Sequence, residues 1–234
     1  MGTESWGAGN FFCPACDSPR LTQSMRNTAA IDYVCPLCES TFQLKSQSKV
    51  FGTKILDSAY SEMKRAIAED RTPNLYVLHY DPAEWAVRTV ILIPRFAFAL
   101  SAVECRKPLA STARRAGWVG CNILLDKIPV DARIPIILGG RAQPRQEVRE
   151  AYQRLRPIEN LKVEKRGWTL DVLREIRSLR KNEFELVDIY SRADDLARLH
   201  PKNFHVRDKI RQQLQVLRDL GLLEFLGGGS YRLR

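Results

Sequence analysis

Long apolar runs are missing from this sequence of 234 residues. No stretch approaches the roughly 20 consecutive apolar residues that a membrane-spanning helix needs. The first residues also lack the charged and then apolar pattern of a secretory signal. Membrane and exported proteins are therefore disfavoured, and we expect a cytoplasmic chain with no membrane partner. Hydrophobic residues nevertheless make up 44% of the chain, with four Trp and nine Phe, so wholesale disorder is excluded.

Acidic side chains are also fewer than basic ones. The chain has 27 acidic against 37 basic side chains, which gives a net charge of +10. Residues 1–150 contain 19 basic and 15 acidic side chains, whereas residues 151–234 contain 18 and 12. An excess of positive charge favours a polyanionic partner, and the C-terminal third is the more basic part. Nucleic acid is therefore the leading candidate partner.

Only six cysteines are present, and four of them form two C-x₂-C pairs that 18 residues separate. These four are Cys13, Cys16, Cys35 and Cys38. The spacing is typical of structural zinc sites, in which a β-hairpin brings two knuckles together around a tetrahedral ion. Four thiolates complete the coordination shell, so the metal would be structural. A disulfide framework or a redox-active pair is the alternative, and we expect the remaining Cys105 and Cys121 to be buried.

A carboxylate and a lysine lie on two adjoining predicted strands. These strands cover residues 31–34 and 41–46, and the second places Gln43 and Lys45 on one face because side chains alternate along a strand. If Asp32 faces the same side, the three polar groups match the pattern of Mg²⁺-dependent nucleases, since Mg²⁺ takes oxygen ligands and a lysine can orient the attacking water. The pattern alone is weak. It favours the alternative in which Asp32 lies in a surface turn and Lys45 on a solvated strand face.

Residues 106–118 show neither helical nor strand periodicity, yet they carry several basic side chains. The basic residues are Arg106, Lys107, Arg114 and Arg115. A basic, irregular loop that ends in Gly117 and Trp118 is typical of a DNA-binding surface, because arginines bind phosphates and guanine edges. The alternative is a solvated loop that Trp118 anchors in the core.

One helix and two strands are predicted between the second cysteine pair and this loop. Asp57 and Ser58 are expected to cap the helix. Its buried stripe would consist of Ala59, Met63 and Ile67. Residues 75–80 and 89–93 are predicted strands of a mixed sheet on which the helix packs. Glycine and proline within residues 131–149 predict loops.

The C-terminal third predicts three helices and a terminal hairpin. Thr169 is expected to cap the first helix, residues 186–198 form the second, and the third begins near Asn203. Residues 222–226 and 230–233 form a hairpin wing, so the module is a winged helix whose third helix enters the major groove. The candidate DNA-contacting residues are Asn203, His205, Arg207, Arg211 and Gln212. The alternative is a winged helix that binds protein.

Longer segments of the sequence match a known family. They are the two C-P-x-C knuckles, Asp32, Leu44-Lys45-Ser46, and residues 106–110, 112–118, 120–123, 166–169, 209–215 and 217–219. On these segments the chain, from Phe12 to Arg234, resembles the DpnI-like restriction endonucleases, which cut GATC sites only when the adenines are N6-methylated.

The resemblance implies a mixed α/β (α+β) architecture with two domains, as the chain length allows. A PD-(D/E)XK nuclease domain would cover residues 1–160, with a zinc ribbon at residues 13–38, and a winged-helix domain would cover residues 161–234. It also implies a type IIM site-specific deoxyribonuclease that uses catalytic Mg²⁺ and structural Zn²⁺. Its partner would be double-stranded DNA with N6-methyladenine, which both domains contact, and we expect a monomer.

The same resemblance assigns roles to individual residues. Asp32, Gln43 and the backbone carbonyl of Leu44 would bind Mg²⁺, Lys45 would assist the attacking water, and Trp118 would contact the methyl groups. The family has Glu where this chain has Gln43, so one negative charge is lost and metal affinity should fall. A decayed site is therefore the alternative, and the protein would then bind methylated DNA without cleaving it. Residues 1–10 are too short and glycine-rich to supply the helix that the family has upstream.

Overall fold

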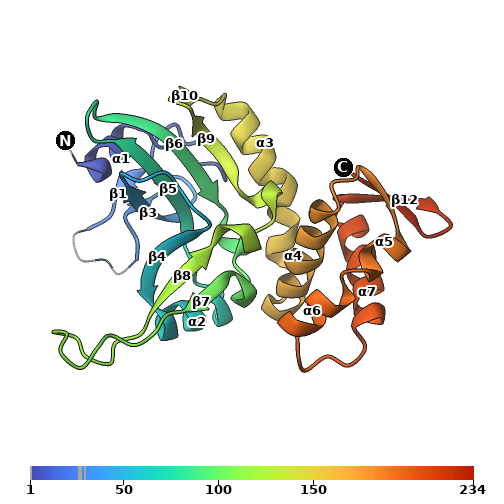
Figure 1. Cartoon of the computed structure of the whole chain (residues 1–234). Coiled ribbons are helices and arrows are strands. Elements are labelled where there is room, and N and C mark those ends of the chain that lie inside the picture. Colours follow the sequence, from blue (N-terminus) through green and yellow to red (C-terminus); the bar gives the residue numbers. More distant parts are fainter. Residues whose placement is uncertain (1, 26–27, 29) are drawn as a thin grey trace.

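The computed structural model describes residues 2–25, 28 and 30–234. Figure 1 shows a part built around β-sheets, followed by a smaller helical part at the C-terminal end, with helix α4 between them. Among the helices of the described residues, none is both long enough and apolar enough to cross a bilayer.

The main sheet has seven strands in the order β1-β2-β3-β5-β6-β9-β10. The strands are β1 (Thr22–Gln23), β2 (Tyr33–Val34), β3 (Thr41–Gln47), β5 (Asn74–Asp81), β6 (Ala86–Ile93), β9 (Ile134–Leu138) and β10 (Arg141–Ala142). β3 and β5 are parallel, and the other neighbours are antiparallel. A parallel pair needs a crossover connection, and the segment between β3 and β5 supplies it. The two strands predicted at residues 75–80 and 89–93 are confirmed as β5 and β6.

A second, antiparallel sheet has the order β4-β8-β7. It consists of β4 (Lys54–Ala59), β8 (Gly120–Leu124) and β7 (Val103–Cys105). Helix α2 (Tyr60–Ala68) follows β4 and buries Met63 and Ile67, as predicted. The predicted cap is wrong, because Asp57 and Ser58 belong to β4 and the N-cap residue is Ala59 without a side-chain bond. β4 pairs with β8 on both sides of this segment, at Leu56 and at Ala59, with a shift of register between them, so the chain stays extended up to the first turn of the helix.

Helix α1 (Thr3–Asn10) corrects the expectation that residues 1–10 cannot form a helix. Its glycine at position 7 is buried, and a Cβ there would lie 2.3 Å from the hydroxyl oxygen of Tyr33. Glycine therefore permits a close approach that outweighs its low helix propensity. The Tyr33 hydroxyl donates to the carbonyl of Glu4 at 2.8 Å, and the ring of Trp6 packs edge-on against Phe11.

Aromatic side chains fill the core beneath β3 and β5. Phe11, Tyr33, Phe42 and Tyr76 are all almost completely buried. The rings of Phe11 and Tyr76 stack with centroids 4.0 Å apart, and the Tyr76 hydroxyl donates to the carbonyl of Phe12 at 2.9 Å. Because Phe42 points into this core from β3, the neighbouring residues Gln43 and Lys45 are left on the other face of the strand.

Residues 131–149 contain more regular structure than predicted. Gly139 and Gly140 do form the turn between β9 and β10, both with positive φ. Helix α3 (Arg145–Leu155) begins directly after Pro144 and was not anticipated. Short 3-10 turns complete this part: η1 (Arg95–Ala97), η2 (Leu100–Ala102), η3 (Leu125–Lys127), η4 (Val130–Ala132) and η5 (Arg156–Asn160).

The C-terminal part contains helices α4 (Val163–Ser178), α5 (Leu186–Tyr190), α6 (Ala193–Leu199) and α7 (Val206–Asp219). Its sheet has the order β11-β13-β12, from β11 (Glu183–Glu185), β13 (Ser230–Leu233) and β12 (Leu223–Gly227). The predicted hairpin wing is confirmed as β12 and β13. The predicted second helix is divided into α5 and α6.

Thr169 does not cap the first helix of this part. It lies in the middle of α4 and is fully buried. Its hydroxyl lies 2.9 Å from the carbonyl oxygen of Lys165 and 2.8 Å from the side-chain oxygen of Gln213 of α7, with hydrogen-bond geometry to both. α4 also ties the two parts of the molecule together: Asp171 accepts a hydrogen bond from Ser101 of η2 at 2.7 Å, and Arg177 pairs with Asp131.

Candidate functional site

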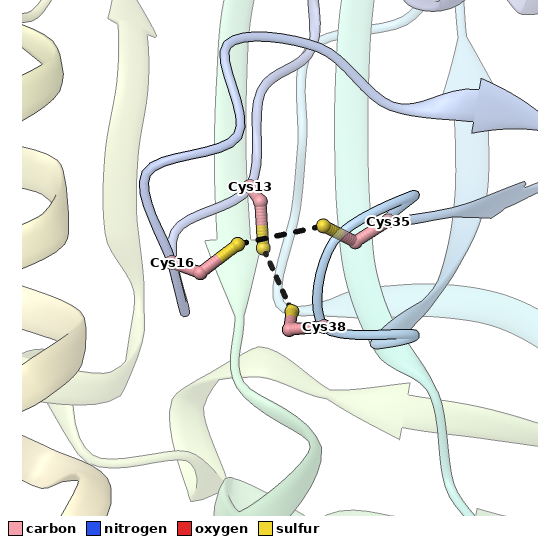
Figure 2. A group of neighbouring side chains, drawn as sticks. All are labelled: Cys13, Cys16, Cys35 and Cys38. Carbon is pink, nitrogen blue, oxygen red and sulfur yellow. Dashed lines mark hydrogen bonds between the residues drawn. The ribbon is translucent and has the colours of Figure 1, made fainter.

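The four paired cysteines converge on one point (Figure 2). The Sγ atoms of Cys13 and Cys38 are 3.6 Å apart, those of Cys16 and Cys35 are 3.5 Å apart, and all four lie within 4.8 Å of one another. A tetrahedral zinc ion with Zn–S bonds of about 2.3 Å would separate its sulfurs by about 3.8 Å. A disulfide requires about 2.05 Å. The cluster is therefore compatible with a zinc site, and the four thiols are free of disulfides.

Burial and backbone donors act in opposite directions on these thiols. Burial raises the pKa of Cys13. Burial also opposes ionisation of Cys35, but the backbone N–H groups of Cys38 and Leu37 donate to its sulfur and bring its pKa down to about 6. The thiolate is the form that a metal binds, so the second knuckle presents one ligand that is ready for a cation.

Helix α3 holds the first knuckle in place. The guanidinium of Arg149 donates to the carbonyls of Cys13 at 3.2 Å and Ser18 at 3.1 Å. Gln153 donates to the carbonyl of Ala15 at 3.0 Å, and the guanidinium of Arg145 lies 5.1 Å from the ring centroid of Phe12. The cysteine cluster is thus packed against the main sheet domain and does not form a separate lobe.

Asp32 lies beside β3 at the position where the sequence pattern requires it. Its Oδ2 accepts a hydrogen bond from the backbone N–H of Leu44 at 2.6 Å, and its own N–H donates to the carbonyl of Phe42 at 2.8 Å. The carboxylate therefore lies against the backbone between Gln43 and Lys45. All three side chains are half-buried. Asp32 itself lies in a bend directly before β2.

A second carboxylate, which the sequence pattern did not indicate, contacts Lys45. The Nζ atom of Lys45 lies 2.7 Å from Oδ1 of Asp57, whose side chain is only 3% exposed. Asp57 comes from β4 in the second sheet, so the ion pair joins the two sheets. The 11 residues between Lys45 and Asp57 contain no recognisable motif. The pairing of β4 with β8 places Asp57 beside Lys45.

The two other cysteines lie on β7 and β8 near this ion pair. Cys121 is buried, as predicted, and its thiol donates to the carbonyl of Ser58 at 3.3 Å. Burial and the nearby carboxylate of Asp57 raise its pKa to about 11. Cys105 faces Cys121 across the strands but is exposed, so the prediction of burial is wrong for Cys105.

Residues 106–118 form a long loop between β7 and β8 that projects from the body of the molecule (Figure 1). Arg106 is half-buried and donates its N–H to the carbonyl of Gly120 at 3.0 Å. The other predicted basic residues of the loop are exposed: Lys107, Arg114 and Arg115. A loop whose base is tied to β8 while its cations face solvent can present these charges to a phosphate backbone.

Trp118 lies at the base of the loop and is half-buried. A Cβ at Gly120 would lie 2.7 Å from its ring, so glycine allows the indole to pack closely against the strand. The guanidinium of Arg115 lies 4.7 Å from the ring centroid of Trp118. The indole is thus held against β8, and part of its surface remains open next to exposed cations.

The candidate DNA-contacting face of α7 is polar and open to solvent. Ile210, Leu214 and Leu217 form its buried stripe. Most of the predicted contact residues are exposed: His205, Arg207, Arg211 and Gln212. Asn203 is half-buried, and its side-chain oxygen accepts a hydrogen bond from the His205 N–H at 2.9 Å. The guanidinium groups of Arg207 and Arg211 lie 5.3 and 5.7 Å from the ring centroid of Tyr190.

Two family models match the chain. The model described as the DpnI, Dam-replacing family matches residues 1–161. The model described as the Dam-replacing HTH domain matches residues 164–233. Together with the four-cysteine cluster, these matches confirm the predicted fold class of a mixed α/β domain followed by a helical DNA-binding module.

Proposed function

The chain belongs to the DpnI (Dam-replacing) family, whose members act in methylation-dependent restriction, and we propose that it is a Mg²⁺-dependent endonuclease that cleaves double-stranded DNA at GATC-like sites containing N6-methyladenine. The observation that carries this proposal is the arrangement along β3. Asp32 accepts a hydrogen bond from the backbone N–H of Leu44, and the ammonium of the next residue, Lys45, pairs with Asp57 of β4. A carboxylate and a lysine are thus held at consecutive positions of one strand.

The donor atoms around this point fit Mg²⁺. The Asp32 carboxylate, the Gln43 amide oxygen and the Leu44 carbonyl are all hard oxygen ligands, which Mg²⁺ prefers, and it retains several waters besides. Bound Mg²⁺ supplies a Lewis acid for the scissile phosphate and lowers the pKa of a coordinated water. Gln43 contributes an oxygen without a charge, so the site should bind Mg²⁺ more weakly than one with a second carboxylate.

Lys45 supplies the positive charge of the site. Its ammonium can orient the attacking water and offset the negative charge that develops on the phosphate during hydrolysis. Asp57 acts through Lys45 as a positioning residue, because a nearly buried carboxylate at 2.7 Å restricts the flexible lysine side chain to one region. The exposed basic loop at residues 106–118 and helix α7 would bind the DNA backbone and base edges on either side of the chemistry.

Gln43 is also the specific observation that favours a second candidate, a protein that binds methylated DNA without cleaving it. One experiment separates the two. Plasmid from a host that methylates adenine in GATC and plasmid from a host that does not are each incubated with the protein in Mg²⁺ or Mn²⁺. Cleavage of the methylated plasmid alone supports the nuclease, whereas retention of that plasmid on a filter without cleavage supports the binding protein. Cleavage of both plasmids to the same extent contradicts the methylation-dependent function.

A further inference from the structure

Phe204 stands out on the surface of the C-terminal part. Its side chain is 89% exposed, although a phenyl ring is normally a core-forming group. It lies directly before His205, the N-cap residue of α7. The other exposed large apolar residues of this part, Val187, Phe225 and Leu226, are 66%, 46% and 39% exposed. Phe204 therefore presents more of its apolar surface to solvent than any of them.

The segment that carries Phe204 is fixed at both of its ends. His200 stacks on the buried Trp168 with ring centroids 3.7 Å apart, and its Nε2 lies 2.8 Å from the carboxylate of Asp171. The N–H of Asn203 donates to the carbonyl of His200 at 2.9 Å, and the side-chain oxygen of Asn203 accepts from the N–H of His205 at 2.9 Å. The exposed ring is thus displayed by an ordered turn, which reduces the entropy that its binding would cost.

The residues around Phe204 point to a polyanionic partner. Lys202 precedes it, and the exposed side chains of His205, Arg207 and Arg211 follow it. Asp208 is the acidic residue in the first turn of α7. An apolar ring among cations fits a partner whose surface combines phosphates with small apolar groups.

The major groove of methylated DNA is such a surface. Residues at the N-terminal end of a recognition helix contact base edges there, and adenine presents its N6 position in the same groove. A methyl group on N6 replaces part of a polar edge by an apolar surface. An arginine or an asparagine gains nothing from that methyl, whereas a phenyl ring buries it and gains about the free energy of one buried CH₂ group.

We propose that Phe204 is a specificity-determining residue of the HTH domain and that its ring contacts the N6-methyl group of adenine. This inference rests on the proposed function, because it presupposes that methylated DNA is the ligand. It adds a second methyl contact that is separate from Trp118. In Figure 1 the loop between α6 and α7 and the loop between β7 and β8 both project from the lower side of the view, at opposite ends of the molecule.

The test measures binding by the full chain with Lys45→Ala in every variant, so that no DNA is cut. Duplexes of one sequence, methylated on both strands, on one strand or on neither, are titrated at a single salt concentration because affinity depends on ionic strength. Phe204→Ala should lower the ratio of methylated to plain affinity about fourfold for each methyl that the ring contacts, the factor that burial of one methyl provides. Affinity for the plain duplex should change little, and Phe204→Leu should keep most of the ratio.

Phe225→Ala is the matched control, since it removes a partly exposed phenyl ring from the wing of the same domain, and its ratio should equal that of the parent. An equal loss on all three duplexes would overturn the proposal, because the ring would then stack on or wedge between bases regardless of methylation. An unchanged ratio in Phe204→Ala would also overturn it.

The parent protein separates failure of this inference from failure of the proposed function. If the parent shows no preference for methylated DNA, the proposed function fails together with this inference. If the parent prefers methylated DNA and Phe204→Ala retains the full preference, only this inference fails. A change from dimer to monomer in sedimentation of Phe204→Ala without DNA would assign the ring to a contact between two copies and would refute the DNA contact.

Discussion

Replacement of Asp57 by Asn removes one charge from the ion pair with Lys45 and leaves the side-chain shape nearly unchanged. The carboxylate is 3% exposed and the lysine 27%, so water screens the pair only from the lysine side. Exposed ion pairs contribute about 0.2–1 kcal/mol, whereas loss of one partner of a fully buried pair costs about 3–5 kcal/mol. This pair is open to water on the lysine side alone, so we expect Asp57→Asn to lower the free energy of unfolding by about 1–2 kcal/mol.

The expected effect on cleavage is larger than the effect on stability. Without the carboxylate, the lysine ammonium can move by an ångström or more, and misplacement of this size can cost about a hundredfold in rate. Single-turnover cleavage of methylated duplex at saturating enzyme should therefore slow by roughly tenfold to a hundredfold. Affinity for methylated DNA should stay close to that of the parent, because the Asp57 side chain is nearly buried and does not present its charge to a phosphate backbone.

Glu104→Gln is the control for this experiment. Glu104 forms a comparable ion pair with Lys54 at 2.7 Å in the same small sheet, but its carboxylate is 38% exposed and the lysine 52% exposed. Its replacement should change neither cleavage rate nor stability appreciably, since exposed pairs contribute little. Cleavage by Asp57→Asn at the parent rate would refute the positioning role.

A stability cycle tests the ion pair itself. Lys45→Met leaves the carboxylate of Asp57 buried without its partner and should be destabilising, whereas the double variant Lys45→Met/Asp57→Asn should recover part of the loss. Urea unfolding of the four proteins gives the coupling free energy. Strictly additive changes would show that the two side chains do not interact in solution.

Further outcomes follow from the zinc site, the nuclease site and the basic loop. The protein should contain one zinc ion per chain by elemental analysis, and Cys16→Ser should lower the thermal unfolding temperature of the sheet domain; a metal-free variant with normal folding would contradict the zinc assignment. Lys45→Ala should abolish cleavage while a filter assay still detects binding to methylated DNA. Gln43→Glu should lower the Mg²⁺ concentration that gives half-maximal cleavage. Loss of cleavage by Gln43→Glu at every Mg²⁺ and Mn²⁺ concentration would contradict the ligand role of residue 43. Trp118→Ala should weaken discrimination between methylated and plain duplexes more than binding to plain DNA, as measured by titration at fixed salt, and an equal loss on both duplexes would argue against a methyl contact.

Features that depend on neighbouring residues were predictable from the sequence. The cysteine cluster follows from the C-x₂-C spacing, because each knuckle is a local turn. A single hairpin between the two knuckles is enough to bring their cysteines together. Strands β5 and β6 and the buried stripe of α7 follow from their apolar periodicity. The wing follows from three consecutive glycines between two β-prone segments.

Features that depend on distant pairing were not predictable in this way. The segment that contains Asp57 has the composition of a helix start, and only its partner strand β8, more than 60 residues away, keeps it extended. Helix α1 forms despite its glycines because one of them meets Tyr33 of β2. Cys105 is exposed although Cys121, its neighbour across the strands, is buried, because Cys105 lies on the edge strand β7 and Cys121 on the central strand β8.

The position of Asp57 also changes what the substitution at Gln43 means for the site. Judged by sequence, the missing acid leaves Lys45 facing a single carboxylate, that of Asp32, and the local charge balance shifts toward positive. The structure adds a carboxylate from β4 in direct contact with the lysine, so part of the lysine charge is compensated before any cation arrives. A cation that binds at Asp32 and Gln43 is therefore repelled less by Lys45 than the sequence pattern alone suggests. Metal affinity and lysine placement thus depend on different carboxylates, which is why Gln43→Glu should act on the Mg²⁺ requirement and Asp57→Asn on the rate at saturating Mg²⁺.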